Sequence, residues 1–320
     1  MRGPTFQGLR ADKTARSVVR QKARVEVAGV SLSHPGRVVF PDSGLTKLDL
    51  ARYYETIAEH VVPHLAGRPL TLLRCPQAIG DDCTFMKHSK VWAPPALRRI
   101  RIQEKTKLGE YLVADSLAAV ISLVQMDVIE IHTWNSRAER VEEPDRIVLD
   151  LDPGPEVSWT QVIQGARLLR EALRALRLES YVKTTGGRGL HVVVPLVPQR
   201  DWSECLAFAR GLAAAIERHD PRHYTTRFAK SGRERKILID YLRNNRTNTS
   251  IAAFSARARP GAPVSVPVSW TELTTRLDPL QFTVRTIPLR LARLRRDPWD
   301  GYFRARQYLT TASLRAAAAI

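Results

Sequence analysis

The sequence has few cysteines, few acidic residues and no long apolar run. Its 320 residues include three cysteines and no Cys-x-x-Cys pair, which argues against a disulfide framework and a cysteine-rich zinc site. We therefore expect buried, reduced thiols. No stretch approaches the ~20 consecutive apolar residues of a membrane-spanning helix, and the N-terminus lacks the apolar centre of a signal peptide. These absences predict a soluble, cytoplasmic protein without a membrane partner.

The shortage of acidic residues gives the chain a strong positive charge. Fifty Lys and Arg stand against 32 Asp and Glu, which leaves a formal net charge of +18, and 40 of the 50 basic residues are arginine. Apolar residues make up 44% and charged residues 26%, so the chain can bury a core and is not merely a basic tail. The composition favours a folded protein that binds a polyanion, in about two domains or one large α/β unit.

Hydrophobic periodicity predicts alternating strands and helices, which is typical of an α/β layer. Residues 1–24, with seven Lys or Arg and one acid, indicate a flexible basic arm. A helix should begin at Thr46, whose spacing to Asp49 resembles a capping box, and continue to Pro63. An Arg-rich helix is expected over 285–320. Other helices are expected at 117–126, 159–178 and 202–218, and strands at 24–30, 37–40, 69–74, 98–103, 111–114, 128–132, 147–151, 181–183, 190–194, 236–240 and 250–254.

The sharpest motif is a pair of carboxylates at the end of an apolar strand. Asp150 and Asp152 are two residues apart, so both side chains should point to one face of the strand. A second apolar strand ends at Asp240. Oxygen ligands of this kind suit Mg²⁺ or Mn²⁺, and three converging acids would hold a two-metal site for phosphoryl transfer. An ordinary Asp-Pro-Gly turn at the strand end remains the alternative, whereas the residues at 154 and 155 fit neither a calcium loop nor a DxDxT phosphatase.

A glycine-rich segment, Thr185-Gly-Gly-Arg-Gly-Leu-His191, follows about thirty residues later. Its glycines permit close approach of the backbone to a ligand, and Thr185, Arg188 and His191 could bind phosphate oxygens. It is not a P-loop, because no Gly-Lys-Ser/Thr is present, nor a dinucleotide-binding turn, because a strand follows it. A hairpin loop with a core histidine is the alternative.

Together these motifs closely resemble the archaeo-eukaryotic primase superfamily, specifically the polymerase domain of bacterial ligase D (LigD). The resemblance covers about Ser31 to Trp299. It rests on the DxD pair, the Thr185–His191 loop and the lone Asp240, with further matches at 33–37, 41–47, 83–88, 129–132, 240–244 and 254–257. The implied fold is α/β (α+β), with mixed or antiparallel sheets flanked by helices. The implied organisation is a basic arm (1–24), one catalytic domain (25–300, with parts 25–145, 146–257 and 258–300) and a basic, alanine-rich tail (301–320).

The resemblance also implies a role for each matching residue. Asp150, Asp152 and Asp240 would be catalytic and bind two Mn²⁺ or Mg²⁺ ions. The 5′-phosphate of DNA would bind to His34, Arg37 and Lys47, and the template to Arg74, Phe85, Lys87 and Arg233. Where family members have a second aromatic, this chain has Thr84. The nucleotide would be bound by His132, Thr185, Gly186, Arg188, His191, Arg243 and Arg257.

The function implied is template-dependent addition of nucleotides, preferentially ribonucleotides, to DNA 3′ ends at gaps and double-strand breaks in bacterial non-homologous end joining. A de novo primase and a non-catalytic end-bridging module are the alternatives. Expected partners are DNA with a 5′-phosphate and NTP or dNTP, with Ku and a separate DNA ligase inferred from the family, in the nucleoid-associated cytoplasm. Since no Lys-x-Asp-Gly ligase signature is present, we expect a stand-alone paralogue or an excised domain.

Overall fold

The computed structural model describes residues 25–80, 82–89 and 93–319, so the predicted arm at 1–24 lies outside the described residues. The helices are α1 (Lys47–Thr56), α2 (Ala58–Leu65), α3 (Leu117–Gln125), α4 (Trp159–Ala175), α5 (Trp202–His219), α6 (Ile287–Arg293) and α7 (Thr311–Ala319). Short 3₁₀ turns are η1 (Ala138–Arg140), η2 (Leu242–Asn244), η3 (Pro279–Gln281) and η4 (Tyr302–Arg304). Within the described ranges, no helix is long and apolar enough to cross a membrane.

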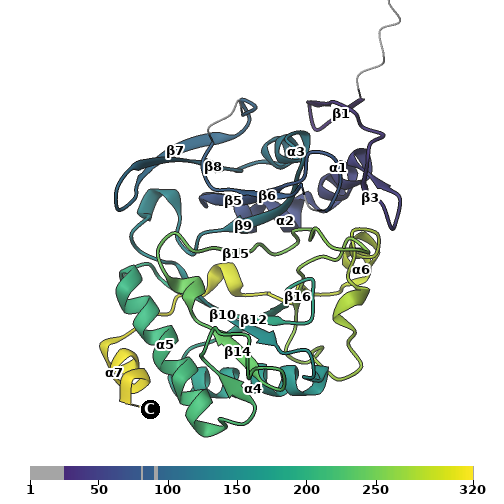
Figure 1. Ribbon diagram of the computed structural model, residues 1–320. Coiled ribbons are helices and arrows are strands. Elements are labelled where there is room, and N and C mark those ends of the chain that lie inside the picture. Colours follow the sequence, from purple (N-terminus) through teal and green to yellow (C-terminus); the bar gives the residue numbers. More distant parts are fainter. Residues whose placement is uncertain (1–24, 81, 90–92, 320) are drawn as a thin grey trace, which may run out of the picture.

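A six-stranded sheet forms the centre of the second half of the chain, in the order β13-β14-β10-β12-β11-β16. All its strand pairs are antiparallel except β13 with β14. Helices α4 and α5 pack against this sheet, and α7 packs on α5 (Figure 1). The strands are β10 (Arg146–Pro153), β11 (Tyr181–Thr184), β12 (Leu190–Pro195), β13 (Tyr224–Thr225), β14 (Ile237–Asp240) and β16 (Pro267–Val268).

The first half of the chain forms a smaller four-stranded sheet, β15-β9-β5-β6, with α3 packed on β9. Its strands are β5 (Leu70–Arg74), β6 (Thr84–Met86), β9 (Val128–Thr133) and β15 (Ser250–Ile251). Because β15 comes from the second half of the chain, it joins the two halves (Figure 1). Three hairpins complete the fold: β1 (Val25–Val27) with β2 (Val30–Leu32), β3 (Val38–Phe40) with β4 (Leu45–Thr46), and β7 (Arg98–Gln103) with β8 (Leu108–Val113).

The structure corrects several predicted elements. The helix expected from Thr46 to Pro63 is divided at Ile57, and Pro63 lies inside α2. The sequence hides this break because its buried positions keep helical spacing across it. The strand expected at 250–254 stops at Ile251. Of the helix expected over 285–320, the described residues 285–319 form two helices and a 3₁₀ turn, since Pro298 and the left-handed Gly301 interrupt them.

The prediction that all three cysteines are reduced is wrong for two of them. Cys75 and Cys83 form a disulfide, whereas Cys205 is free and buried. Cys75 directly follows β5 and Cys83 directly precedes β6, and these two strands pair antiparallel. The hairpin brings the two Cα atoms to 4.3 Å, a proximity that the sequence spacing alone does not reveal.

Candidate active site

Three carboxylates converge where β10 and β14 lie side by side. The antiparallel register places Asp150 directly opposite Asp240, and Asp152 lies two residues further along β10. Each acid offers an oxygen within 4.8 Å of an oxygen of the other two. The predicted convergence of the three acids is therefore confirmed, and their oxygens are close enough together to hold a metal ion.

Cationic and imidazole groups surround the most buried of these acids. Arg243 Nε donates to Asp150 Oδ2 at 3.2 Å and lies 3.0 Å from Asp240 Oδ2. His191 Nε2 lies 3.2 Å from Asp150 Oδ2. Burial alone would raise the pKa of Asp150, but His191 and Arg243 together lower it. Burial lowers the pKa of His191 to about 4, so its ring is neutral at pH 7.

The pKa values of the other two acids are raised, as expected where carboxylates gather at a partly buried site. The charge of Asp150, followed by burial, raises the pKa of Asp152 to about 6, and burial raises that of Asp240. Asp150 Oδ1 is buried without a hydrogen-bond partner among the described residues. A buried carboxylate oxygen without a donor, next to two more acids, fits a divalent cation with oxygen ligands.

The glycine-rich loop joins β11 to β12 beside these acids. Gly186 has φ of +69°, which favours glycine. A Cβ at Gly189 would lie 2.5 Å from the carbonyl oxygen of Leu151, so only glycine permits this contact with the β10 strand. Thr185 Oγ1 donates to the Gly189 carbonyl at 3.2 Å and closes the loop. The backbone therefore comes within contact of the strand that carries the acids.

A buried glutamate that the sequence analysis missed connects two predicted ligands. Glu130 Oε1 accepts from Arg257 Nε at 3.0 Å, and Oε2 lies 2.8 Å from His132 Nε2. Arg257 Nη1 in turn donates to the Thr185 carbonyl. Burial opposes ionisation of Glu130, but His132 and Arg257 lower its pKa to about 2. The sequence pattern that could have indicated this contact is the spacing of residues 130 and 132, which places both side chains on one face of β9.

A cavity of about 410 Å³ opens between these groups. Asp150 and Asp152 line it, together with six of the seven predicted nucleotide ligands; Gly186 is the exception. Arg259, which the sequence analysis missed, also lines the cavity. Arg188 is held at its side by donating to the carbonyls of Pro155 and Val157. One acidic pair thus faces four arginines across a space that could admit a nucleotide.

A second basic group lies around Asp127. Arg37 and Lys47 both pair with its carboxylate, Lys47 Nζ at 2.8 Å, and Arg74 Nη2 lies 3.6 Å away. Burial lowers the pKa of Lys47. Three cations thus share one carboxylate, which leaves positive charge for an anion such as a phosphate. The structure places Arg74, predicted to contact the template, in this group.

His34, which completes the predicted phosphate site, has left-handed backbone geometry. Its φ is 51°, and its carbonyl oxygen accepts from the Arg37 N–H at 3.0 Å in a turn. The backbone N–H of Lys47 donates to the Arg37 carbonyl, so the turn, Arg37 and Lys47 are connected through the main chain.

The remaining predicted template residues are divided between two places. Phe85 is 64% exposed, and its ring lies edge-on to His132 with centroids 5.5 Å apart. Lys87 follows β6 and is exposed. Arg233 instead lies near the acids, where its charge favours ionisation of Asp152. An exposed aromatic face therefore borders the nucleotide-sized cavity.

Three carboxylates that could hold a metal ion, a glycine-rich loop and four arginines lie around one cavity, an arrangement that fits a nucleotidyltransferase-type enzyme. The model of the LigD primase-polymerase domain matches residues 46–299, and the chain belongs to that family. The resemblance inferred from the motifs is thereby confirmed.

The comparisons with individual proteins agree. The multifunctional non-homologous end joining protein LigD of Pseudomonas aeruginosa is 35% identical over 98% of this chain and 40% of its own length. That of Mycolicibacterium smegmatis is 34% identical over 76% of this chain and 32% of its own length. The chain thus spans about two fifths or less of these relatives. The solved polymerase domain from Mycobacterium tuberculosis ligase D in complex with DNA has a TM-score of 0.80 at 30% identity, over 85% of this chain and 97% of that one. The predicted fold class is confirmed.

Proposed function

We propose that this chain adds nucleotides, preferentially ribonucleotides, to DNA 3′ ends at gaps and double-strand breaks during bacterial non-homologous end joining. The main observation in support of the proposal is that the carboxylates of Asp150, Asp152 and Asp240 lie close together beside an arginine-lined cavity. The names of its relatives and the DNA in the solved homologue support it.

The three acids would hold two divalent cations, Mn²⁺ or Mg²⁺. When bound, such cations stabilise the charge on the attacking and leaving oxygens of a phosphoryl transfer. The chain supplies the environment for them. Arg243 keeps Asp150 ionised and contacts Asp240, while neutral His191 contacts the same Asp150 oxygen.

The triphosphate would bind between the glycine loop and the arginines. Backbone N–H groups of the loop and the guanidinium groups of Arg188, Arg257 and Arg259 offer donors to phosphate oxygens. The Thr185 hydroxyl would join them by turning away from the Gly189 carbonyl. Because Glu130 holds both Arg257 and His132, it would fix the phosphate ligand and the residue beside the sugar in one arrangement. His132 would then contact the ribose 2′-hydroxyl.

The DNA would be oriented by the two groups outside the cavity. The cations around Asp127, with His34, would bind a recessed 5′-phosphate, and Phe85 would stack on a template base. Ku and a separate ligase would be partners in a nucleoid-associated, cytoplasmic process.

Extension of a 5′-labelled primer in Mn²⁺ tests this function against the alternatives. We expect templated addition to a primer at a gap, with greater use of NTP than of dNTP. Synthesis that requires no primer would favour a de novo primase. DNA binding without any addition would favour an end-bridging module and would contradict the proposal.

A further inference from the structure

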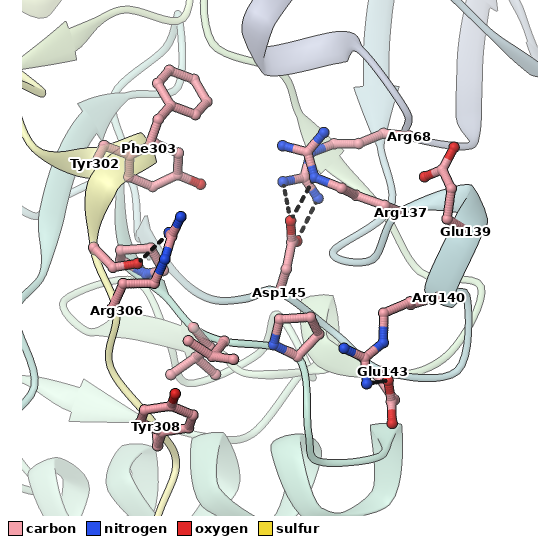
Figure 2. A pocket seen from close by; sticks show the side chains of 15 residues that line it. Arg68, Arg137, Glu139, Arg140, Glu143, Asp145, Tyr302, Phe303, Arg306 and Tyr308 are labelled. Carbon is pink, nitrogen blue, oxygen red and sulfur yellow. Dashed lines mark hydrogen bonds and ion pairs between the residues drawn. The ribbon is translucent and has the colours of Figure 1, made fainter.

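A second cavity, of about 620 Å³, is lined by residues near the start of β10, away from the acids. Figure 2 shows the side chains that line it. Pro195, in its lining, pairs with Arg146 at the start of β10, whereas Asp150 pairs with Asp240. Arg146 and Asp150 are separated by four residue steps, about 13 Å at the rise of a strand. This cavity is therefore a separate feature from the nucleotide-sized one.

Two exposed aromatic side chains line this cavity. Phe303 and Tyr308 are 45% and 47% exposed, which is high for large aromatics. The Phe303 ring packs against buried His64 and Tyr302, at centroid distances of 4.9 and 5.0 Å. One side of Phe303 is thus fixed by the protein, and the rest of the ring stays accessible.

The charges around the cavity have a positive excess. Arg68 and Arg137 share the single carboxylate of Asp145: Arg68 Nη1 lies 2.6 Å from Oδ1 and Arg137 Nε 3.1 Å from Oδ2 (Figure 2). Arg306 has no acidic partner among the described residues; its only hydrogen bond there goes to the neighbouring carbonyl of Ala305. Two guanidinium charges therefore remain without their own counterion.

A further arginine is balanced by an acid. Arg140 pairs with Glu143 on the same side of the cavity, and Glu139 pairs with Arg98 outside it. These pairs account for the remaining acids of the lining, so no acid is left over to offset Arg306.

We propose that this cavity binds single-stranded DNA, with bases stacked on Phe303 and Tyr308 and phosphates on Arg306 and the arginines at Asp145. Exposed aromatic faces next to basic groups are how proteins bind single strands without sequence preference. Along a duplex the bases are stacked inside and only the terminal pair exposes a face, so a duplex cannot offer successive bases to two separate aromatic rings. An uncharged apolar peptide would cover the aromatic faces but would leave the two guanidinium charges without a counterion. The proposal depends on the proposed function only for the source of the strand, an unpaired overhang at a DNA end.

Two variants separate the aromatic from the ionic contribution. The double variant Phe303→Ala/Tyr308→Ala removes both aromatic rings. Arg306→Glu reverses the charge of an exposed residue whose only described hydrogen bond goes to its neighbour's backbone, so the Arg306→Glu protein should fold normally. Leu280→Ala, at a 54% exposed apolar residue elsewhere, and Arg315→Glu, at an exposed arginine on α7, are matched controls.

The measurement is fluorescence anisotropy of fluorescein-labelled dT12 in EDTA at fixed salt. We expect at least fivefold weaker binding for each pocket variant and less than twofold change for each control. Nucleotide addition to a gapped duplex should stay at the wild-type rate in both pocket variants, which separates this proposal from the proposed function. An affinity for dT12 within twofold of wild type in both pocket variants would overturn the proposal, and it is the result expected if the cavity instead held a protein partner. Losses of equal size in the control variants would also overturn it.

Discussion

Glu130 and Arg257, 127 positions apart in the chain, form a buried ion pair with Nε 3.0 Å from Oε1. The same glutamate contacts His132 from its other oxygen. A single carboxylate thus connects β9 of the first half to the arginine-bearing loop of the second, directly beside the cavity that we propose binds the nucleotide.

Substitution of this glutamate should weaken nucleotide binding more than it weakens folding. In Glu130→Gln the amide keeps the shape but loses the charge, so Arg257 and His132 are less firmly placed. Loss of a charge-assisted hydrogen bond is worth about 1.5–3 kcal/mol, so we expect a rise of roughly tenfold or more in KM for NTP. Steady-state kinetics on a gapped substrate measures it, with Glu139→Gln, an exposed glutamate, as the control. An unchanged KM would contradict the positioning role.

The cations around Asp127 should discriminate DNA by its 5′ end. Lys47→Gln removes the most buried of them while keeping a polar side chain. We expect the wild-type chain to prefer a gap with a 5′-phosphate over one with a 5′-hydroxyl, and the variant to lose most of that preference. Anisotropy with both substrates at matched salt tests it. Lys107→Gln, at an exposed lysine of the β7–β8 turn, is the control and should keep the wild-type ratio of the affinities for the 5′-phosphate and 5′-hydroxyl gaps. If Lys47→Gln also keeps that ratio, the result would contradict the phosphate site.

The disulfide between Cys75 and Cys83 should stabilise the β5–β6 hairpin that carries Phe85. Closing so short a loop reduces the entropy of the unfolded chain by an amount worth about 2–3 kcal/mol. Urea unfolding with and without reductant should show this difference for the wild type and none for Cys83→Ser. Cys205→Ser, at the buried free thiol, should keep the response to reductant. Equal unfolding curves for oxidised and reduced wild type would contradict the assignment.

Buried His64 should make stability depend on pH. Burial, with nearby Arg146 and Arg68, lowers its pKa well below the ordinary value of 6.5. The folded state therefore keeps the ring neutral while the unfolded state binds a proton, so stability falls as pH falls below 6.5. From pH 6.5 to 5.0 this one group should cost about 1–2 kcal/mol. His64→Leu should show a correspondingly flatter pH dependence of the free energy of unfolding; the same slope in both would be inconsistent with a neutral His64.

Local sequence patterns were sufficient to predict the catalytic half of the chain. Asp150 and Asp152 follow an apolar run, and the glycines after Thr185 permit a close backbone approach. Both patterns lie within a few consecutive residues, so they can be recognised without knowledge of the fold. The convergence of the three acids, expected because two apolar strands end in them, is confirmed by the register that places Asp150 opposite Asp240.

Features that depend on contacts between distant segments could not be predicted in this way. Glu130 meets Arg257 only because β9 lies beside the loop after β15, and no spacing encodes that contact. The Cys75–Cys83 bond depends on the β5–β6 hairpin, and the break at Ile57 is hidden because the buried face continues across it. Phe303 and Arg306 fell within a stretch that the sequence analysis treated as a basic tail.

The most direct test of the account is Mn²⁺ binding and nucleotide addition by Asp240→Asn, measured together by isothermal titration calorimetry and primer extension. The substitution preserves the shape of the side chain but removes one of the three converging charges. We predict much weaker Mn²⁺ binding and a fall in addition of at least a hundredfold, with affinity for gapped DNA unchanged. Wild-type Mn²⁺ binding and normal extension by this variant would contradict the three-carboxylate site.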